Sequence, residues 1–167
     1  MAGYNLKDLV VLIVDDSQHM RILTRTMLLS LGLRSKNVFD VDSAPKAYEF
    51  LKNQDVDIII CDWLMKPVSG IDFIKKLRQF PPDGKPNPFQ PVILLTGNSE
   101  LESVLIAREA GINEFLAKPI APKDLYLRIK SIIENPRLFI RTATYVGPDR
   151  RRQDVPIDFP DRRKKKE

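Results

Sequence analysis

Five polar side chains that directly follow short apolar runs could do chemistry together if the fold brings them close. They are the carboxylates of Asp15, Asp16 and Asp62, the hydroxyl of Thr96 and the ammonium group of Lys118. Three carboxylates held together repel one another, which raises their pKa values unless a cation lies between them. A hard divalent cation with oxygen ligands, for which Mg²⁺ is the best match, relieves this repulsion. A carboxylate supported by such an ion and a lysine can form an aspartyl phosphate.

Five strands alternating with five helices must position these side chains. The apolar runs predict strands at residues 9–14, 37–41, 57–61, 92–95 and 114–117. Apolar residues at helical spacing, with Ser, Pro and Gly at the ends, predict helices at 18–31, 44–51, 70–77, 100–110 and 122–134. This alternation indicates an α/β fold in which helices cover both faces of an open parallel sheet. The carboxyl ends of parallel strands share one edge, so the five polar side chains are expected in one crevice. Taken alone, Asp62 would be read as a turn residue at the end of a strand, and Lys118 could form a plain ion pair with it.

The charge of the chain divides it into a neutral domain and a basic arm. Residues 1–136 hold 17 basic and 17 acidic residues, whereas residues 137–167 hold 10 basic and 5 acidic ones. We therefore predict one domain over 1–136, with a core at about 7–134, and an extended or disordered arm over 137–167. Clustered Arg and Lys could bind nucleic acid, and the arm could instead dock on a protein or cover the domain itself. The arm has no helix-turn-helix pattern and no zinc-ligand spacing, which disfavours nucleic acid.

Two further features bear on structure and compartment. The segment 80–91 has proline at five of its twelve positions, which predicts an extended and stiff surface loop. No apolar run approaches the roughly 18–20 residues of a membrane span, and the first residues lack the layout of a signal peptide. The lone Cys61 excludes an internal disulfide, so we predict a cytoplasmic protein without a membrane span.

The complete set of strand-end residues resembles a known family. Asp15-Asp16, Asp62, Thr96 and Lys118-Pro119, together with Met65 and Gly70 at their spacings from Asp62, are similar to the receiver domain of bacterial two-component response regulators, including the stand-alone chemotaxis type. The resemblance spans about residues 7–134. It implies a flavodoxin-like, doubly wound sheet with strand order 2-1-3-4-5.

The same resemblance implies a reaction and its ligands. A histidine kinase or phosphotransfer protein would transfer a phosphoryl group to Asp62. Mg²⁺ would be bound by Asp15, Asp16 or both, by Asp62 and by the backbone carbonyl of Leu64. Lys118 would pair with the phosphoryl oxygens.

The resemblance also implies how the signal would leave the site. Thr96 would hydrogen-bond the phosphoryl group and move inward, and the switch aromatic Phe115 would rotate into the space left behind. The face formed by the fourth helix, fifth strand and fifth helix would then change its affinity for an output protein, with a homodimer as another possible outcome. A static core residue is the alternative for Phe115.

The loops beside Asp62 depart from the family pattern. Lys66 occupies the position where the family usually has proline, and Pro67 comes one residue later. Leu64 is apolar where many relatives are polar, so we predict that it hinders water and prolongs the phosphorylated state. Leu64, Lys66, Gly97 and Asn98 are therefore expected to modulate the reaction.

Other functions remain open from the sequence. A Mg²⁺-dependent phosphatase with an aspartyl nucleophile usually carries Asp-x-Asp after one strand and needs a substrate-selecting cap, and neither is visible. An intermediate in a phosphorelay would need the same residues as a switch. We expect no enzymatic activity beyond self-phosphorylation and autodephosphorylation.

Overall fold

A central five-stranded parallel sheet organises the computed structural model, which describes residues 5–97 and 100–150. The strand order is β2-β1-β3-β4-β5, with every pair parallel, as predicted. The strands are β1 (Val11–Val14), β2 (Val38–Val41), β3 (Ile58–Asp62), β4 (Val92–Thr96) and β5 (Glu114–Ala117).

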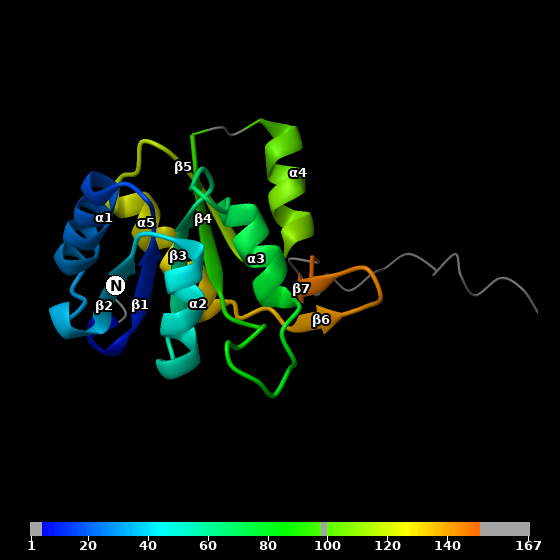
Figure 1. The fold of residues 1–167 in the computed structure, drawn as a ribbon. Helices are drawn as coiled ribbons and strands as arrows, with labels where there is room; N and C mark the ends of the chain where they lie inside the picture. Colours follow the sequence, from blue (N-terminus) through cyan, green and yellow to red (C-terminus); the bar gives the residue numbers. More distant parts are fainter. Residues whose placement is uncertain (1–4, 98–99, 151–167) are drawn as a thin grey trace, which may run out of the picture.

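Five α-helices connect these strands and cover both faces of the sheet. They are α1 (Gln18–Ser30), α2 (Ala44–Asn53), α3 (Gly70–Arg78), α4 (Leu101–Ala110) and α5 (Pro122–Glu134), with short 3₁₀ turns at Leu6–Asp8 and Ser35–Asn37. Serines at positions 17, 43 and 69 cap α1, α2 and α3 by accepting a backbone N–H of the first turn. Two separate apolar cores place α1 and α5 on one face and α2, α3 and α4 on the other (Figure 1).

The strands read as continuous apolar runs because helices bury both of their faces. Every residue of β1, β3 and β4 is buried, whereas the edge strands β2 and β5 are partly exposed. Full burial of one such Val, Ile or Leu side chain contributes about 1.5–3 kcal/mol. Among the described residues, no helix is both long and apolar enough to cross a membrane.

Segment 80–91 was predicted to be a surface loop, but two of its prolines are buried. Pro86 and Pro88 are buried, and so is Gln90. The guanidinium of Arg78, itself buried at the end of α3, holds the second half of the loop there by donating hydrogen bonds to the carbonyls of Pro88 and Gln90. The loop is thus pinned to the domain at its second half.

The first part of the arm, which was predicted as extended or disordered, consists of extended strands that pack on the domain. Residues 139–148 form an antiparallel hairpin of β6 (Phe139–Arg141) and β7 (Val146–Pro148), which lies beside the lower ends of α3 and α4 in Figure 1. Its short strands lack a clear apolar period, so its order comes from packing on the domain. Arg137 and Arg141 donate hydrogen bonds to the Asn113 and Phe80 carbonyls. Residues 151–167 of the arm lie outside the described residues.

Candidate functional site

The sheet register brings the predicted strand-end residues to one edge. Val14 pairs with Cys61, Asp62 pairs with Leu95, and Thr96 pairs with Ala117. Polar residues at or just beyond these positions therefore lie side by side where the strands end. They are Asp15, Asp16, Asp62, Thr96 and Lys118.

The three carboxylates converge as predicted. Oxygen atoms of Asp15, Asp16 and Asp62 all lie within 4.8 Å of one another, with Asp15 and Asp62 buried and Asp16 exposed. Lys118 Nζ lies 2.6 Å from Asp62 Oδ1. The ion pair considered for Lys118 is therefore present, and it places an ammonium group directly on the buried carboxylate. One cation on three acids leaves the cluster with excess negative charge.

Asp15 provides the test of whether a divalent cation fits. Its Oδ1 accepts the Ser17 N–H at 2.9 Å, whereas its buried Oδ2 has no hydrogen-bond partner within the described part of the chain. Burial raises the pKa of Asp15, the Ser17 hydrogen bond lowers it, and the charge of Asp62 raises it further. A buried carboxylate oxygen without a partner is costly, and a cation at this point would satisfy it. The donor set, all carboxylate oxygens, fits a hard ion such as Mg²⁺.

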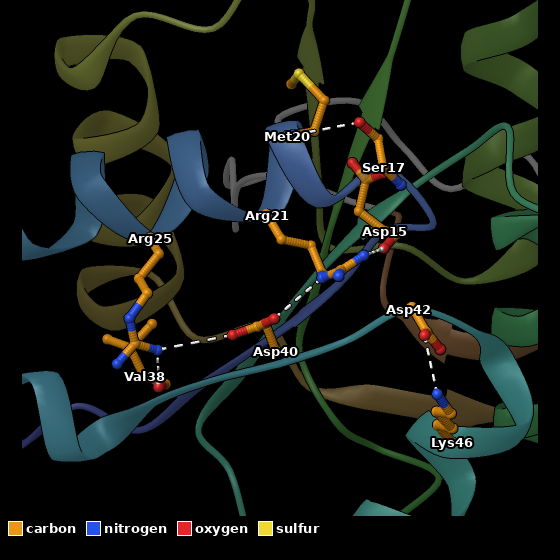
Figure 2. A network of polar contacts seen from close by, with 9 residues as sticks. All are labelled: Asp15, Ser17, Met20, Arg21, Arg25, Val38, Asp40, Asp42 and Lys46. Atoms are coloured by element: carbon orange, nitrogen blue, oxygen red, sulfur yellow. Dashed lines mark hydrogen bonds and ion pairs between the residues drawn. The ribbon is translucent and has the colours of Figure 1, made fainter.

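Arg21 of α1 supports the Asp15 backbone, and the sequence reasoning missed it. Figure 2 shows its side chain reaching from α1 to the Asp15 carbonyl, with a contact of 2.9 Å from Nη1, while Nε contacts Asp40 Oδ2 at 3.0 Å. The bridge ties the end of β1 to the edge strand β2. The only sequence signal is a basic residue one helical turn after the Ser17 cap, which is not specific.

The loop after Asp62 folds back tightly on the strand. The Trp63 carbonyl accepts the N–H groups of Gly70 at 2.8 Å and Met65 at 3.2 Å. A Cβ added to Gly70 would lie 2.1 Å from the Asp62 carbonyl oxygen, so only glycine fits at this position. The start of α3 therefore packs directly on the backbone of Asp62, the predicted phosphorylation site, and restrains it.

The atypical residues of this loop lie beside the acidic cluster. The Lys66 N–H donates to Asp16 Oδ2 at 3.1 Å, and a cis peptide bond joins Lys66 to Pro67. The side chain of Leu64 is 78% exposed. Leu64, two residues after Asp62, therefore lies on the surface rather than in the core.

The predicted switch residues occupy neighbouring positions on β4 and β5. Thr96 is buried, and its carbonyl accepts the Lys118 N–H at 2.7 Å. Phe115 pairs with Leu94, two residues before Thr96, so Phe115 and Thr96 project from the same face of the sheet. Phe115 is half-buried against the core beneath α3 and α4. A Cβ added to Gly97 would meet nothing within 4 Å, and Asn98 lies outside the described residues.

We expect Asp15→Asn to stabilise the metal-free protein. Burial raises the pKa of Asp15, which means that ionising this carboxyl group is harder in the folded than in the unfolded protein. The folded state therefore loses stability as pH rises through the raised pKa. An amide removes the charge, keeps the acceptor for Ser17 and turns a donor toward the other two acids. Thermal unfolding at pH 7 in EDTA should show a melting temperature about 2–4 °C higher, equivalent to about 1 kcal/mol.

Added Mg²⁺ should reverse the order of the two proteins, because only the parent keeps all three ligands. Asp83→Asn in the exposed Pro-rich loop is the matched control. A melting temperature lower than the parent's in EDTA would refute the charge argument.

Comparisons with known proteins agree with this geometry. The family model described as the response regulator receiver domain matches residues 11–130. Chemotaxis protein CheY-3 of Vibrio cholerae is 30% identical over 128 residues, which cover 77% of this chain and 94% of that protein. The chemotaxis protein CheY homolog of Campylobacter jejuni is 31% identical over 124 residues, covering 74% and 91%.

Solved structures repeat the same fold. A putative response regulator from Chloroflexus aurantiacus has a TM-score of 0.67 and 28% identity, covering 75% of this chain and 98% of that one. Vibrio cholerae chemotaxis protein CheY4 has a TM-score of 0.64 and 25% identity, covering 74% and 98%. The range matched by the family model, residues 11–130, contains all five strands of the sheet and every strand end of the acidic site. The chain belongs to the response regulator receiver domain family and is a phosphorylation-regulated switch of the two-component, chemotaxis-like type.

Proposed function

We propose that this protein accepts a phosphoryl group on Asp62 from a histidine kinase or phosphotransfer protein, with Mg²⁺ as cofactor, and then changes its affinity for a protein partner. The observation that carries the proposal is the buried Asp62 carboxylate, 2.6 Å from Lys118 Nζ and within 4.8 Å of the carboxylates of Asp15 and Asp16. A carboxylate so placed is suited to act both as a nucleophile and as a metal ligand.

In the transfer step an Asp62 carboxylate oxygen attacks the phosphorus atom. The bond from phosphorus to the donor atom breaks, and the donor keeps the electron pair. The Lys118 ammonium, already beside Oδ1 of Asp62, stabilises the negative charge of the phosphoryl oxygens. The Thr96 hydroxyl is proposed to hydrogen-bond one of these oxygens, which would draw the end of β4 toward Asp62.

Receiver domains bind Mg²⁺ at an acidic pocket, and the three carboxylates here could hold it. We assign Asp15, Asp16, Asp62 and the backbone carbonyl of Leu64 as its protein ligands. When bound, the ion supplies positive charge for the phosphoryl oxygens during transfer. Asp15 and Asp16 would hold the ion in place. Without the ion, repulsion between their carboxylates destabilises the acidic cluster.

The output is proposed to leave through α4, β5 and α5. Exposed apolar side chains on this side are Leu101, Leu105 and Ile106 of α4 and Leu127 of α5, which suits a protein partner. Phe115 of β5 is only half-buried, and we propose that its ring changes position when Thr96 moves. Binding of a different output protein and formation of a homodimer would both use this surface.

A protein partner is favoured over nucleic acid by the contacts of the described part of the arm, residues 137–150. Two arginines of its described part, Arg137 and Arg141, are engaged with carbonyls of the domain itself. We propose no catalysis on other molecules, only the protein's own phosphorylation and dephosphorylation. The buried, lone Cys61 suits the reducing cytoplasm, which is the proposed location.

Leu64→Asn is expected to shorten the lifetime of the phosphorylated state several-fold. The exposed leucine next to Asp62 cannot hydrogen-bond water, whereas an amide can orient a water molecule for attack on phosphorus. The measurement is the decay of the phosphoryl adduct by intact mass after the donor is removed. Leu138→Asn is the control, because Leu138 is equally exposed, at 80%, and lies next to the β6–β7 hairpin instead of the site. Equal decay in the parent and Leu64→Asn would refute the idea.

Incubation with a small phosphodonor tests the proposed function itself. Intact-mass analysis of the parent should show one phosphoryl adduct with Mg²⁺ and none with EDTA. The absence of an adduct with Mg²⁺, or an equal adduct in EDTA, would overturn the proposal.

A further inference from the structure

The β6–β7 hairpin is in backbone contact with the turn between α4 and β5. A Cβ added to Gly147 would lie 2.7 Å from the Gly111 Cα and 2.5 Å from the Tyr145 hydroxyl of the same hairpin. One added to Gly111 would lie 2.5 Å from the Val146 carbonyl oxygen. Gly111 also ends α4 in the left-handed conformation, with φ of 91°. Both glycines are therefore required by the close approach of two chain segments, which seats the hairpin at one defined point on α4.

Arg78 holds the same turn from within the domain. Its Nε and Nη2 donate to the Gly111 carbonyl at 3.0 and 2.7 Å, and its Nη1 donates to the Pro88 and Gln90 carbonyls at 2.8 and 2.7 Å. Burial lowers the pKa of Arg78 to about 9, so the guanidinium is still charged at neutral pH. Phe139 of β6 covers this group, with its ring centroid 4.9 Å from the guanidinium carbon.

Arg137, just before the hairpin, holds the start of β5. Its Nη2 donates to the Asn113 carbonyl at 2.8 Å and lies 3.8 Å from Glu114 Oε1. The Asn113 side chain in turn accepts the Val92 N–H at 3.0 Å, which links the turn to β4. The arm thus contacts the α4–β5 turn at two residues, Gly111 and Asn113.

The N-terminal end of α4 lies away from the hairpin. It begins at Leu101, a few residues after Thr96, and the hairpin lies at the opposite end of the helix (Figure 1). Within the described residues, the arm thus meets α4 at the C-terminal end of the helix, whereas the N-terminal end of α4 follows Thr96 of the proposed site by five residues.

We propose that residues 137–150 act as a clamp that fixes the C-terminal end of α4, so that phosphorylation moves this helix by pivoting it about Gly111. This inference rests on the proposed function for the phosphorylation step, but the clamp itself does not. The arm would then be a built-in restraint on the output face, setting how far α4 can move. A solvated tail would leave α4 unaffected.

Hydrogen exchange of the unphosphorylated protein tests the clamp. The variant Gly147→Val forces a side chain into the Gly111 contact, and Ala143→Val at the exposed hairpin tip is the matched control. We expect amides of the last turn of α4 and of residues 111–113 to exchange at least about tenfold faster in Gly147→Val, with α1 and α2 unchanged. Parent-like exchange of α4 in Gly147→Val would overturn the clamp.

A milder variant covers the case in which Gly147→Val accelerates exchange everywhere. Phe139→Leu keeps an apolar side chain in the hairpin but removes the ring from Arg78. It should accelerate exchange at the same amides by a smaller factor. Unchanged exchange at the α4–β5 turn in this variant would also overturn the clamp.

The pivot is tested by repeating the exchange after phosphorylation. In the parent, the change should concentrate in the N-terminal half of α4, whereas in the clamp variants it should extend to the C-terminal half. Equal change along α4 in the phosphorylated parent would overturn the pivot. Failure of the parent to take up phosphate would refute the proposed function instead, and leave the clamp to be decided by the unphosphorylated proteins.

Discussion

Replacing Asp62 by Asn is expected to abolish the phosphoryl adduct. The amide lacks the negative charge needed to attack phosphorus, and Lys118 loses the carboxylate that it contacts at 2.6 Å. Mg²⁺ affinity should also fall, because the cluster drops from three carboxylates to two. Intact-mass analysis with a small phosphodonor and Mg²⁺ should detect no adduct on the variant under conditions that modify most of the parent.

The loss should not be caused by unfolding, because Asn has nearly the same shape as Asp and relieves repulsion in the acidic cluster. The variant's thermal unfolding should therefore resemble the parent's. Asp83→Asn, which changes an exposed acid of the Pro-rich loop, should keep the full adduct. An adduct of parental size on Asp62→Asn would show that another residue takes the phosphoryl group.

Arg78→Met should cost about 3–5 kcal/mol of the free energy of unfolding. The substitution keeps an apolar side chain of similar length but leaves the carbonyls of Gly111, Pro88 and Gln90 without the guanidinium donors. Each buried acceptor left unpaired costs about 1–3 kcal/mol. Urea denaturation should show a lower midpoint with a similar slope.

Two control variants separate the causes of this loss. Arg108→Met removes an exposed arginine of α4 and should change the free energy of unfolding by less than about 0.5 kcal/mol. Arg78→Lys keeps the charge, but the ammonium group lacks the planar fork with which the guanidinium reaches three carbonyls. This variant should therefore lose most of the stability that Arg78→Met loses. A parental midpoint for Arg78→Met would contradict the role assigned to the buried guanidinium.

The sheet and the acidic site were accessible from sequence because their signals are local. Apolar runs such as Ile58–Cys61 mark a strand buried on both faces, and the polar residue that follows marks its exposed end. Parallel pairing then forces Asp15, Asp62 and Lys118 to one edge without any knowledge of side-chain contacts. The strand order 2-1-3-4-5 came from the family resemblance, and the structure has it.

Arg78 was not predictable, because the residues that bury it come from elsewhere in the chain. By its own pattern it is a basic residue in the last turn of a helix, where a solvated side chain is normal. It becomes buried only when the Pro-rich loop and the hairpin close over it. The same contacts order residues 137–150 as a hairpin, where the sequence predicted only an extended or disordered arm. Prediction failed where tertiary contacts between distant segments replace local periodicity.

The position of the phosphoryl group is the most direct test of the central claim, that the converging strand ends make Asp62 the acceptor. Borohydride reduces an aspartyl phosphate to homoserine, so peptide mass spectrometry of the phosphorylated and reduced parent reads the site without any substitution. We predict homoserine at position 62 and at no other aspartate. Homoserine at position 15 or 16, or the phosphoryl group on a residue outside the acidic cluster, would contradict the account.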